Sequence, residues 1–314
     1  MKKIIVIAAA VLFSAFAASA QDLAQATELF NNGATALQDK DYATALTSFE
    51  QALSVALAAE DDEEGQKASL VSDCKKIIPN VNLSIAKDAI KDADYTTGIE
   101  QLKKTAAIAA EYEQADVADE VATLLPSVYM TQGNSLLNAK DYAGALAAFN
   151  EVLALNPNDG MAALRKGMAL GALGKNDEAE EAYNIAIANG QEAAAKKQLS
   201  TIYVKKASAE LKNKAYAAAA EFALKSNEYL ENANAYKIAG TAYSQLKKSA
   251  EAIDNFKKYL ELSPNAKDAA QIMYTIAATA QQSGDKATAK EYYEKIVNDP
   301  KFGATAKQQL AAIK

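Results

Sequence analysis

Histidine, the side chain that most often acts as a general base, is absent from all 314 positions. Its absence removes the Ser-His and Cys-His nucleophile systems and most catalytic zinc sites. Paired carboxylates, as in glycoside hydrolysis, could still act, but no spacing in the sequence pairs two of them across a cleft. The sequence therefore predicts a protein that is not an enzyme, with no catalytic residues, no metal site and no cofactor.

Gly174-Lys175 resembles the end of a phosphate-binding loop. Such a loop needs a glycine five places before the Gly-Lys pair and a hydroxyl residue after it. Ala169 and Asn176 occupy those two places. We therefore assign Gly167 to helix packing and Gly174 to a turn between helices.

Cys74 is the single cysteine, so no intramolecular disulfide can form. Leu70, Ile77 and Ile78 lie at helical spacing from it, which favours a buried core residue over a redox site. The acidic run at residues 61–64 lacks the alternating ligands of a calcium loop, so we expect a solvated turn there.

The first residues have the features of a secretory signal peptide. Lys2 and Lys3 precede an apolar stretch, Ile4–Ala17, and small residues end at Ala20 before polar Gln21. The stretch is short for a membrane span, although an uncleaved anchor is the alternative. We expect cleavage after Ala20 and a periplasmic or secreted bacterial protein with no integral membrane segment after cleavage.

Without Lys2 and Lys3, the 33 basic residues fall to 31 against 40 acidic ones, a net charge of −9. This charge repels nucleic acid and anionic membrane surfaces. Arg165 is the only arginine, which further weakens any case for base or phosphate recognition. The expected partner is a protein or peptide, with no nucleic acid.

The composition is that of a helical protein. Hydrophobic residues make up 50% of the chain, and only 13 glycines and 5 prolines interrupt residues that favour helices. We predict an all-α fold.

One segment carries a distinctive order of bulky and small residues: Tyr129, Gly133, Tyr142, Ala145, Phe149 and Pro157. This order resembles the tetratricopeptide repeat, a pair of antiparallel helices. Small residues let the two helices approach closely, and we expect the ring of the second helix to fill the space between neighbouring hairpins. Val152 stands where the repeat has another small residue.

Further copies follow the same order. Gly167 lies 34 residues after Gly133, the step of this repeat. Other copies contain Gly33 with Phe49, Gly240 with Phe256, and Ala277 with Tyr293. Two copies are weaker: the second-helix ring is missing around Ala86 and Leu102, and around Ala207 it appears one place early, as Phe222. The resemblance implies an α-solenoid, a superhelix of stacked antiparallel hairpins with about seven repeats.

We divide the chain into a signal peptide at 1–20, an irregular helical region at 21–125 and a regular array at 126–314. The regular array ends in a capping helix over residues 304–313, with Leu310 and Ile313 on its apolar face. Pro79 and Pro126 either begin the hairpins that follow them or lie inside single long helices.

The resemblance implies that the first helices of the hairpins line a concave groove, the usual peptide site of the family. Counting along these helices predicts the following groove residues: Met130, Asn134, Met161, Leu164, Arg165, Met168, Lys205, Ser208, Lys237 and Thr241. Arg165, Lys205 and Lys237 would form a cationic stripe suited to an acidic segment. Alternatively, the apolar members pack between hairpins and the lysines are simply solvated.

The sequence thus predicts a non-catalytic, exported scaffold or adaptor that mediates protein–protein interactions in the bacterial cell envelope. The alternative is a structural subunit of an envelope assembly or transport complex, which would make its contacts through the N-terminal helices.

Overall fold

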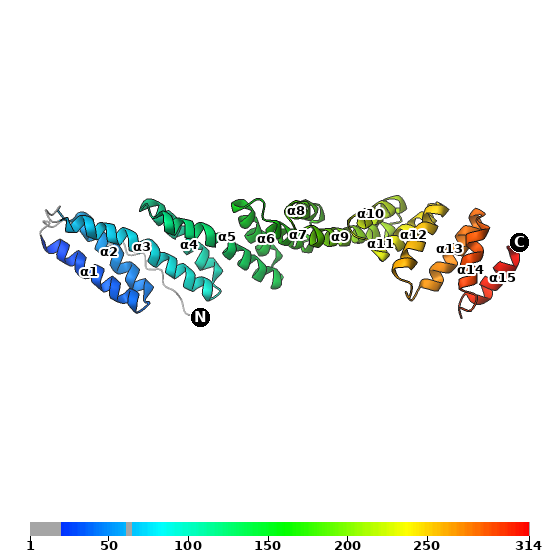
Figure 1. The fold of residues 1–314 in the computed structure, drawn as a ribbon, viewed down its shortest axis with the longest axis horizontal. Coiled ribbons are helices and arrows are strands. Elements are labelled where there is room, and N and C mark those ends of the chain that lie inside the picture. The colour runs from blue at the N-terminus through cyan, green and yellow to red at the C-terminus, as the bar shows by residue number, and fades with distance from the viewer. Residues whose placement is uncertain (1–19, 61–64, 314) are drawn as a thin grey trace. The chain divides into compact units, whose positions relative to one another are not determined.

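The computed structural model describes residues 20–60 and 65–313, which form fifteen α-helices and no β-strand (Figure 1). The predicted signal peptide and the predicted turn at 61–64 fall on segments outside the described residues. The chain divides into two compact units, and the division lies after Gln132, inside a helix. The predicted boundary at residue 125 stays a prediction. The all-α expectation is confirmed for the described residues.

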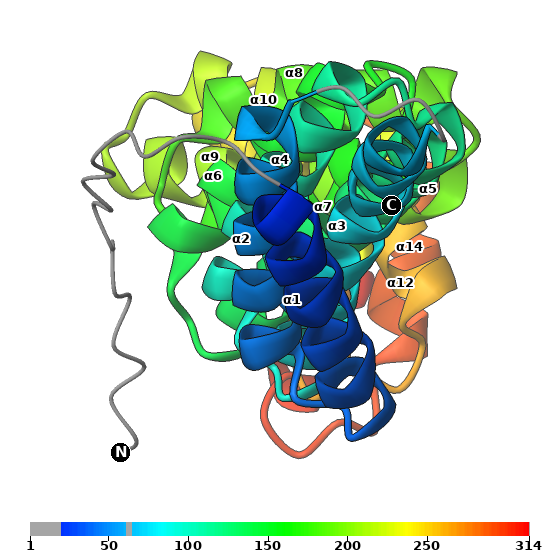
Figure 2. The ribbon, with the colours of Figure 1, turned by 90° about the vertical axis from the view of Figure 1, so that its left-hand side faces the viewer.

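The first unit contains two hairpins and most of a fifth helix. Its helices are α1 (Ala20–Gln38), α2 (Tyr42–Ala58), α3 (Gln66–Lys91), α4 (Tyr95–Glu111) and the greater part of α5 (Ala115–Asn138). Helices α1, α2 and α3 lie side by side (Figures 1 and 2). In each hairpin we call the earlier helix the first helix and the later one the second helix.

Pro79 and Pro126 lie inside continuous helices, α3 and α5. Of the two alternatives that the sequence left open, the single long helix is therefore the one observed. Proline removes one backbone hydrogen bond from a helix, so packing must compensate for it. Pro79 is buried, and α3 packs against both the preceding helix, α2, and the following helix, α4.

The second unit continues the same pattern from the end of α5. Its further helices are α6 (Tyr142–Leu155), α7 (Gly160–Ala172), α8 (Asn176–Ala188), α9 (Glu192–Lys212), α10 (Tyr216–Tyr229), α11 (Ala233–Gln245), α12 (Ser249–Leu262), α13 (Ala269–Ser283), α14 (Lys286–Lys295) and α15 (Gly303–Ala312). Consecutive helices pack as stacked hairpins. In the described residues, α1 to α14 make seven hairpins, so the predicted solenoid and repeat number are confirmed.

All seven hairpin turns in the described residues end the first helix in the same way. A left-handed residue follows the helix cap at Lys40, Ala93, Lys140, Gly174, Lys214 and Lys247, and at Gly284 the cap itself is left-handed. Backbone N–H groups then satisfy the last carbonyls of the helix. The Lys140 N–H donates to the Leu137 carbonyl at 3.1 Å. The Asp141 N–H donates to the Leu136 carbonyl at 2.9 Å.

An aspartate begins the second helix in four of these hairpins. The Asp141 carboxylate, for example, accepts a hydrogen bond from the Gly144 N–H at 2.9 Å. Such a cap satisfies an N–H group that has no partner within the helix. The left-handed residue and the aspartate together fix a short, sharp turn between antiparallel helices.

A ring of the second helix lies against a glycine of the first helix in four hairpins. The pairs are Gly33 with Phe49, Gly133 with Phe149, Gly167 with Tyr183, and Gly240 with Phe256. A Cβ atom on Gly167 would lie 2.6 Å from a Tyr183 ring carbon, which is too close for any side chain. We expected the ring between neighbouring hairpins; the observed contact lies within its own hairpin, because only glycine leaves room for it there.

Cys74 is a core residue, as predicted. Its side chain is fully buried and packs in a cluster with Phe49 and Ile78. Burial raises the pKa of the Cys74 thiol to about 11, so the reactive thiolate is disfavoured.

The segment predicted as a capping helix contains α15. Leu310 and Ile313 pack against the core cluster that α13 and α14 share, while Lys307 is exposed. This helix therefore covers apolar surface of the hairpin formed by α13 and α14.

Candidate functional site

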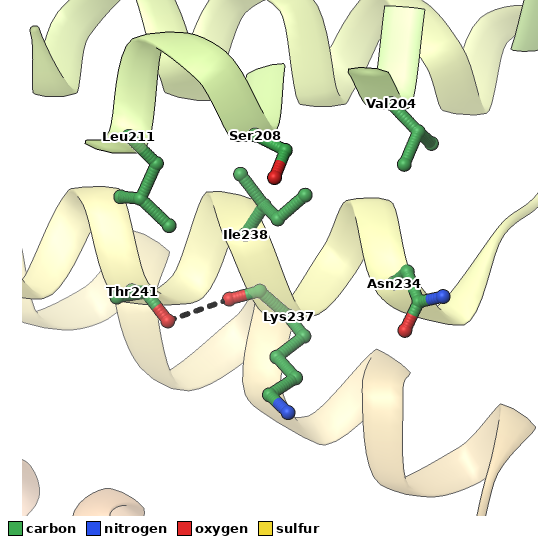
Figure 3. Close-up of a pocket in the computed structure, with 7 residues that line it drawn as sticks. All are labelled: Val204, Ser208, Leu211, Asn234, Lys237, Ile238 and Thr241. Carbon is green, nitrogen blue, oxygen red and sulfur yellow. Dashed lines mark hydrogen bonds between the residues drawn. The ribbon is translucent and has the colours of Figure 1, made fainter. Parts of the chain in front are cut away.

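A pocket of about 290 Å³ lies between α9 and α11, the first helices of two neighbouring hairpins. Its lining comes from both helices: Val204, Ser208 and Leu211 from α9, and Asn234, Lys237, Ile238 and Thr241 from α11 (Figure 3). Apolar side chains from each helix face polar side chains within one small volume.

Helical spacing brings these side chains together. Ser208 lies four residues after Val204 and three before Leu211, so the three share one face of α9. Another face of α9 carries Ala207, which is fully buried in a cluster with Ala223 of α10 and Ala239 of α11. The buried alanines let the helices approach closely, and they leave the lining residues facing the pocket.

Among the described residues, Lys237 is the only charged side chain that lines the pocket. Its ammonium forms an ion pair with the Asp268 carboxylate and lies 5.6 Å from the centre of the Tyr259 ring. The Tyr259 hydroxyl donates a hydrogen bond of 2.6 Å to the same carboxylate. The positive charge of Lys237 is therefore already balanced within the protein.

This arrangement shifts the pKa values of two groups. The Lys237 ammonium and the Tyr259 hydroxyl hold the pKa of the Asp268 carboxyl below its usual value. Burial, followed by the hydrogen bond to Asp268, raises the pKa of Tyr259 to about 12. Neither shift moves a group towards neutral pH, where a general acid or base would act.

The hydroxyl groups of the pocket differ in their partners. The Thr241 hydroxyl donates to the Lys237 backbone carbonyl at 2.8 Å, within α11 (Figure 3). The Ser208 hydroxyl has no hydrogen-bond partner in the described part of the chain. Ser208 can therefore donate to, or accept from, a group that enters the pocket.

The pocket brings together three of the ten predicted groove residues, Ser208, Lys237 and Thr241. Lys205 is exposed on α9 and does not line the pocket, whereas Val204, one residue earlier, does. The predicted stripe of three cations is thus reduced, because Lys237 is paired and Lys205 lies beside the pocket.

The other predicted residues lie on α5 and α7. Leu164 is buried in a core cluster and Met168 packs against the same cluster, as the alternative reading of the sequence expected, while Met161 is 40% exposed. A guanidinium nitrogen of Arg165 lies 4.0 Å from the Met168 sulfur. Its buried Nε has no partner among the described residues.

Met130 and Asn134 are half-buried on α5 and fall on either side of the division between the two units. The sequence analysis missed four lining residues: Val204, Leu211, Asn234 and Ile238. Steps of three and four residues from Ser208 and Lys237 would have found all of them.

The described residues contain no group of three histidine, cysteine or carboxylate side chains that could hold a metal ion. A helix both long and apolar enough to cross a membrane is likewise not found among the described residues.

The tetratricopeptide repeat family matches residues 130–196, 233–266 and 270–298. The last two segments begin at α11 and reach into α14, so they include the α11 side of the pocket. No curated protein matches the chain.

Several solved structures are similar to the chain. MamA AMB-1 is 25% identical, with 60% of this chain and 98% of that protein covered and a TM-score of 0.38. YrrB, described as a TPR protein with an unusual peptide-binding site, is 19% identical over 58% and 91%, with a TM-score of 0.34. PilF of Pseudomonas aeruginosa is 18% identical over 61% and 93%, with a TM-score of 0.31.

Proposed function

Because the chain is a tetratricopeptide repeat protein, we propose that it is a non-catalytic scaffold that binds an extended segment of a partner protein between α9 and α11. Stacked hairpins of this kind present extended surfaces to partner proteins. The observation that carries the proposal is the pocket, which faces outward from the first helices and has a mixed apolar and polar lining.

The lining favours an aliphatic side chain of the partner. Val204, Leu211 and Ile238 supply apolar surface for such a side chain. The Ser208 hydroxyl is positioned to bond the peptide backbone beside that side chain. With Lys237 held by Asp268, the pocket itself does not require a charged group on the partner.

Two observations support the non-catalytic part of the proposal. The sequence contains no histidine. Around the pocket, the pKa of Asp268 is lowered and that of Tyr259 is raised, the opposite of the shifts that prepare an acid or a base for work near pH 7.

Filling the pocket tests this proposal. Ser208→Phe would occupy the volume, whereas Ala217→Phe places the same ring on an exposed position of α10, outside the lining. Affinity capture with the tagged native chain should recover one stoichiometric partner, which Ala217→Phe retains and Ser208→Phe loses at unchanged helicity. Equal recovery with both variants would contradict binding at this pocket, and recovery of no partner by the native chain would contradict the scaffold function.

We further propose that the scaffold is exported and acts in the bacterial cell envelope. The support lies in the sequence, where Lys2 and Lys3 precede the apolar stretch Ile4–Ala17 and the small residues that end at Ala20. N-terminal sequencing of the protein from fractionated cells should find Gln21 first, in the periplasmic or secreted fraction. Protein that keeps Met1 and remains in the cytoplasm would contradict export.

A further inference from the structure

Four lysines stand at two neighbouring hairpin turns of the second unit. Lys212 and Lys214 lie where α9 turns into α10, and Lys247 and Lys248 lie where α11 turns into α12. All four side chains are exposed, and none forms an ion pair with another described residue. We call these four residues the lysine cluster.

The lysine cluster is a local excess of positive charge in an acidic protein. The whole chain has a net charge of −7. Within four residues of the cluster the sequence places only two acids, Glu210 and Glu251. A cation near a helix C-terminus is favourable, but a single lysine at each turn would meet that need.

The backbone at these turns does not favour lysine. Lys214 and Lys247 have φ angles of 63° and 58°, in the left-handed region where glycine is the least strained residue. Gly174 occupies the same place in the preceding hairpin, with a φ of 78°. Lys40 and Lys140 occupy the same place in earlier hairpins, and each is followed by an aspartate. Lys214 and Lys247 each have a second lysine within two residues instead, and turn geometry does not account for this second lysine.

The pocket leads to the lysine cluster. Val204 and Asn234 mark one end of the pocket, and Leu211 and Thr241 mark the other, so α9 and α11 run past it in the same direction (Figure 3). Both helices then end at the turns that carry the cluster. A chain lying along the pocket and leaving at the Leu211 end would pass over these lysines.

We propose that the partner segment continues from the pocket into a run of acidic residues, whose carboxylates bind the lysine cluster. This inference rests on the proposed function, because the pocket supplies the anchor for the same segment. The aliphatic side chain gives the segment its position, and the carboxylates add affinity and speed association through charge attraction. Complementary charge also selects against basic segments.

Short fluorescein-labelled peptides and the full-length protein test the proposal by fluorescence anisotropy. One probe carries a leucine followed by a run of glutamates, and a second carries the glutamates first, since the direction of the segment is open. Matched probes have glutamine in place of every glutamate. The variant Lys212→Gln/Lys214→Gln/Lys247→Gln/Lys248→Gln removes the cluster.

A matched control neutralises four other exposed lysines and so has the same net charge: Lys76→Gln/Lys91→Gln/Lys104→Gln/Lys140→Gln. One of the glutamate probes should bind the native chain, and removal of the cluster should weaken that binding by about tenfold or more at low salt, because several exposed ion pairs are lost. The control variant should bind within about twofold of the native chain, and the glutamine probes should not distinguish the cluster variant from the native chain.

Other outcomes separate this inference from the proposed function. In one outcome, the glutamine probes bind the native chain but not Ser208→Phe, and the glutamate probes bind the cluster variant as tightly as the native chain. This outcome would support binding at the pocket and overturn the role of the lysines. Failure of both glutamate probes to bind the native chain would also overturn it. Displacement of the glutamate probe by single-stranded DNA would assign the cluster to polyanions in general and contradict an acidic protein segment.

Discussion

At the scale of single residues, the glycines that face aromatic rings set how closely the two helices of a hairpin approach. Tyr183 is 2% exposed and its ring carbons would lie within 3 Å of a Cβ on Gly167, so the ring has no open space to move into. A Cβ atom on Gly171, one turn later in α7, would have only the Tyr183 hydroxyl oxygen near it, at 3.9 Å.

These two glycines of one helix should respond in opposite ways to alanine. Gly167→Ala should lower the free energy of unfolding by about 1 to 3 kcal/mol, because the buried ring must shift. Gly171→Ala should raise it by about 0.5 to 1 kcal/mol, because alanine loses less backbone entropy in a helix. Urea unfolding followed by circular dichroism measures both. A loss of stability for Gly171→Ala as large as that for Gly167→Ala would contradict the assigned contact.

The left-handed turn residues support a second prediction. Lys140→Gly should stabilise the protein by about 1 kcal/mol, because glycine adopts a positive φ without strain. At the equivalent turn position of the next hairpin, replacing the glycine by a residue with a side chain, Gly174→Ala, should destabilise the protein by a similar amount. Thermal unfolding of the two variants and the native chain provides the comparison, and equal melting temperatures for all three would show that these turns are not strained at lysine.

For single residues, some features of the structure could be predicted from the sequence and others could not. The repeat spacing predicted a small residue at Gly167, but it placed the ring of the second helix between neighbouring hairpins and so did not predict the contact of Tyr183 with Gly167. It did not predict the left-handed backbone at Lys140, because five of the seven turn positions in the described residues hold a residue other than glycine. At such turns the hydrogen bonds of the helix end, rather than the residue type, decide the backbone conformation.

At the scale of elements, three side chains next to the pocket connect consecutive helices. Lys237 comes from α11, Tyr259 from α12, and Asp268 is the residue that precedes α13. Their ion pair and hydrogen bond tie one hairpin to the next, and they also hold the Lys237 side chain at the edge of the pocket.

The pKa of Asp268 makes this connection dependent on pH. A carboxyl whose pKa is lower in the folded state contributes stability above its unfolded pKa, and that contribution is lost as the pH falls through the folded pKa. Asp268→Asn should therefore destabilise the protein by less than about 1 kcal/mol at pH 7, since the pair is partly exposed. The stability difference should begin to shrink as the pH falls below about 4, the unfolded pKa, and should vanish only below the folded pKa.

Urea midpoints between pH 3 and pH 7 test this decrease. A stability difference between Asp268→Asn and the native chain that stays constant over this range would contradict the role assigned to the carboxylate. Glu251→Gln offers a matched control, because it removes an exposed carboxylate of α12 and should leave the pH profile unchanged.

The type and number of the helices could be predicted from the sequence, but whether α3 and α5 continue through their prolines could not. Strong helix formers and the repeat pattern predicted the hairpins. Pro79 and Pro126 left two alternatives, because proline is acceptable both in the first turn of a helix and inside one that is well packed. The outcome at Pro79 depends on its burial between α2 and α4, which the local sequence does not contain.

At the scale of the whole molecule, function depends on which faces of the repeats stay open. Three residues predicted from the repeat register, Ser208, Lys237 and Thr241, line the pocket, whereas the predicted Lys205 does not and its neighbour Val204 does. The repeat register also predicted Lys237 as a free cation, since Asp268 lies 31 residues further along the chain and its approach depends on tertiary structure.

Site-specific photocrosslinking in the cells that make the protein is the most direct test of the central claim, that a partner protein binds between α9 and α11. A photoreactive phenylalanine at Val204 or Asn234 would line the pocket, and the same group at exposed Glu221 of α10 is the control. One and the same protein should be crosslinked from Val204 and Asn234 and be absent from the Glu221 sample. Equal crosslinking from Glu221, or crosslinking only from probes placed in α1 to α4, would contradict the claim.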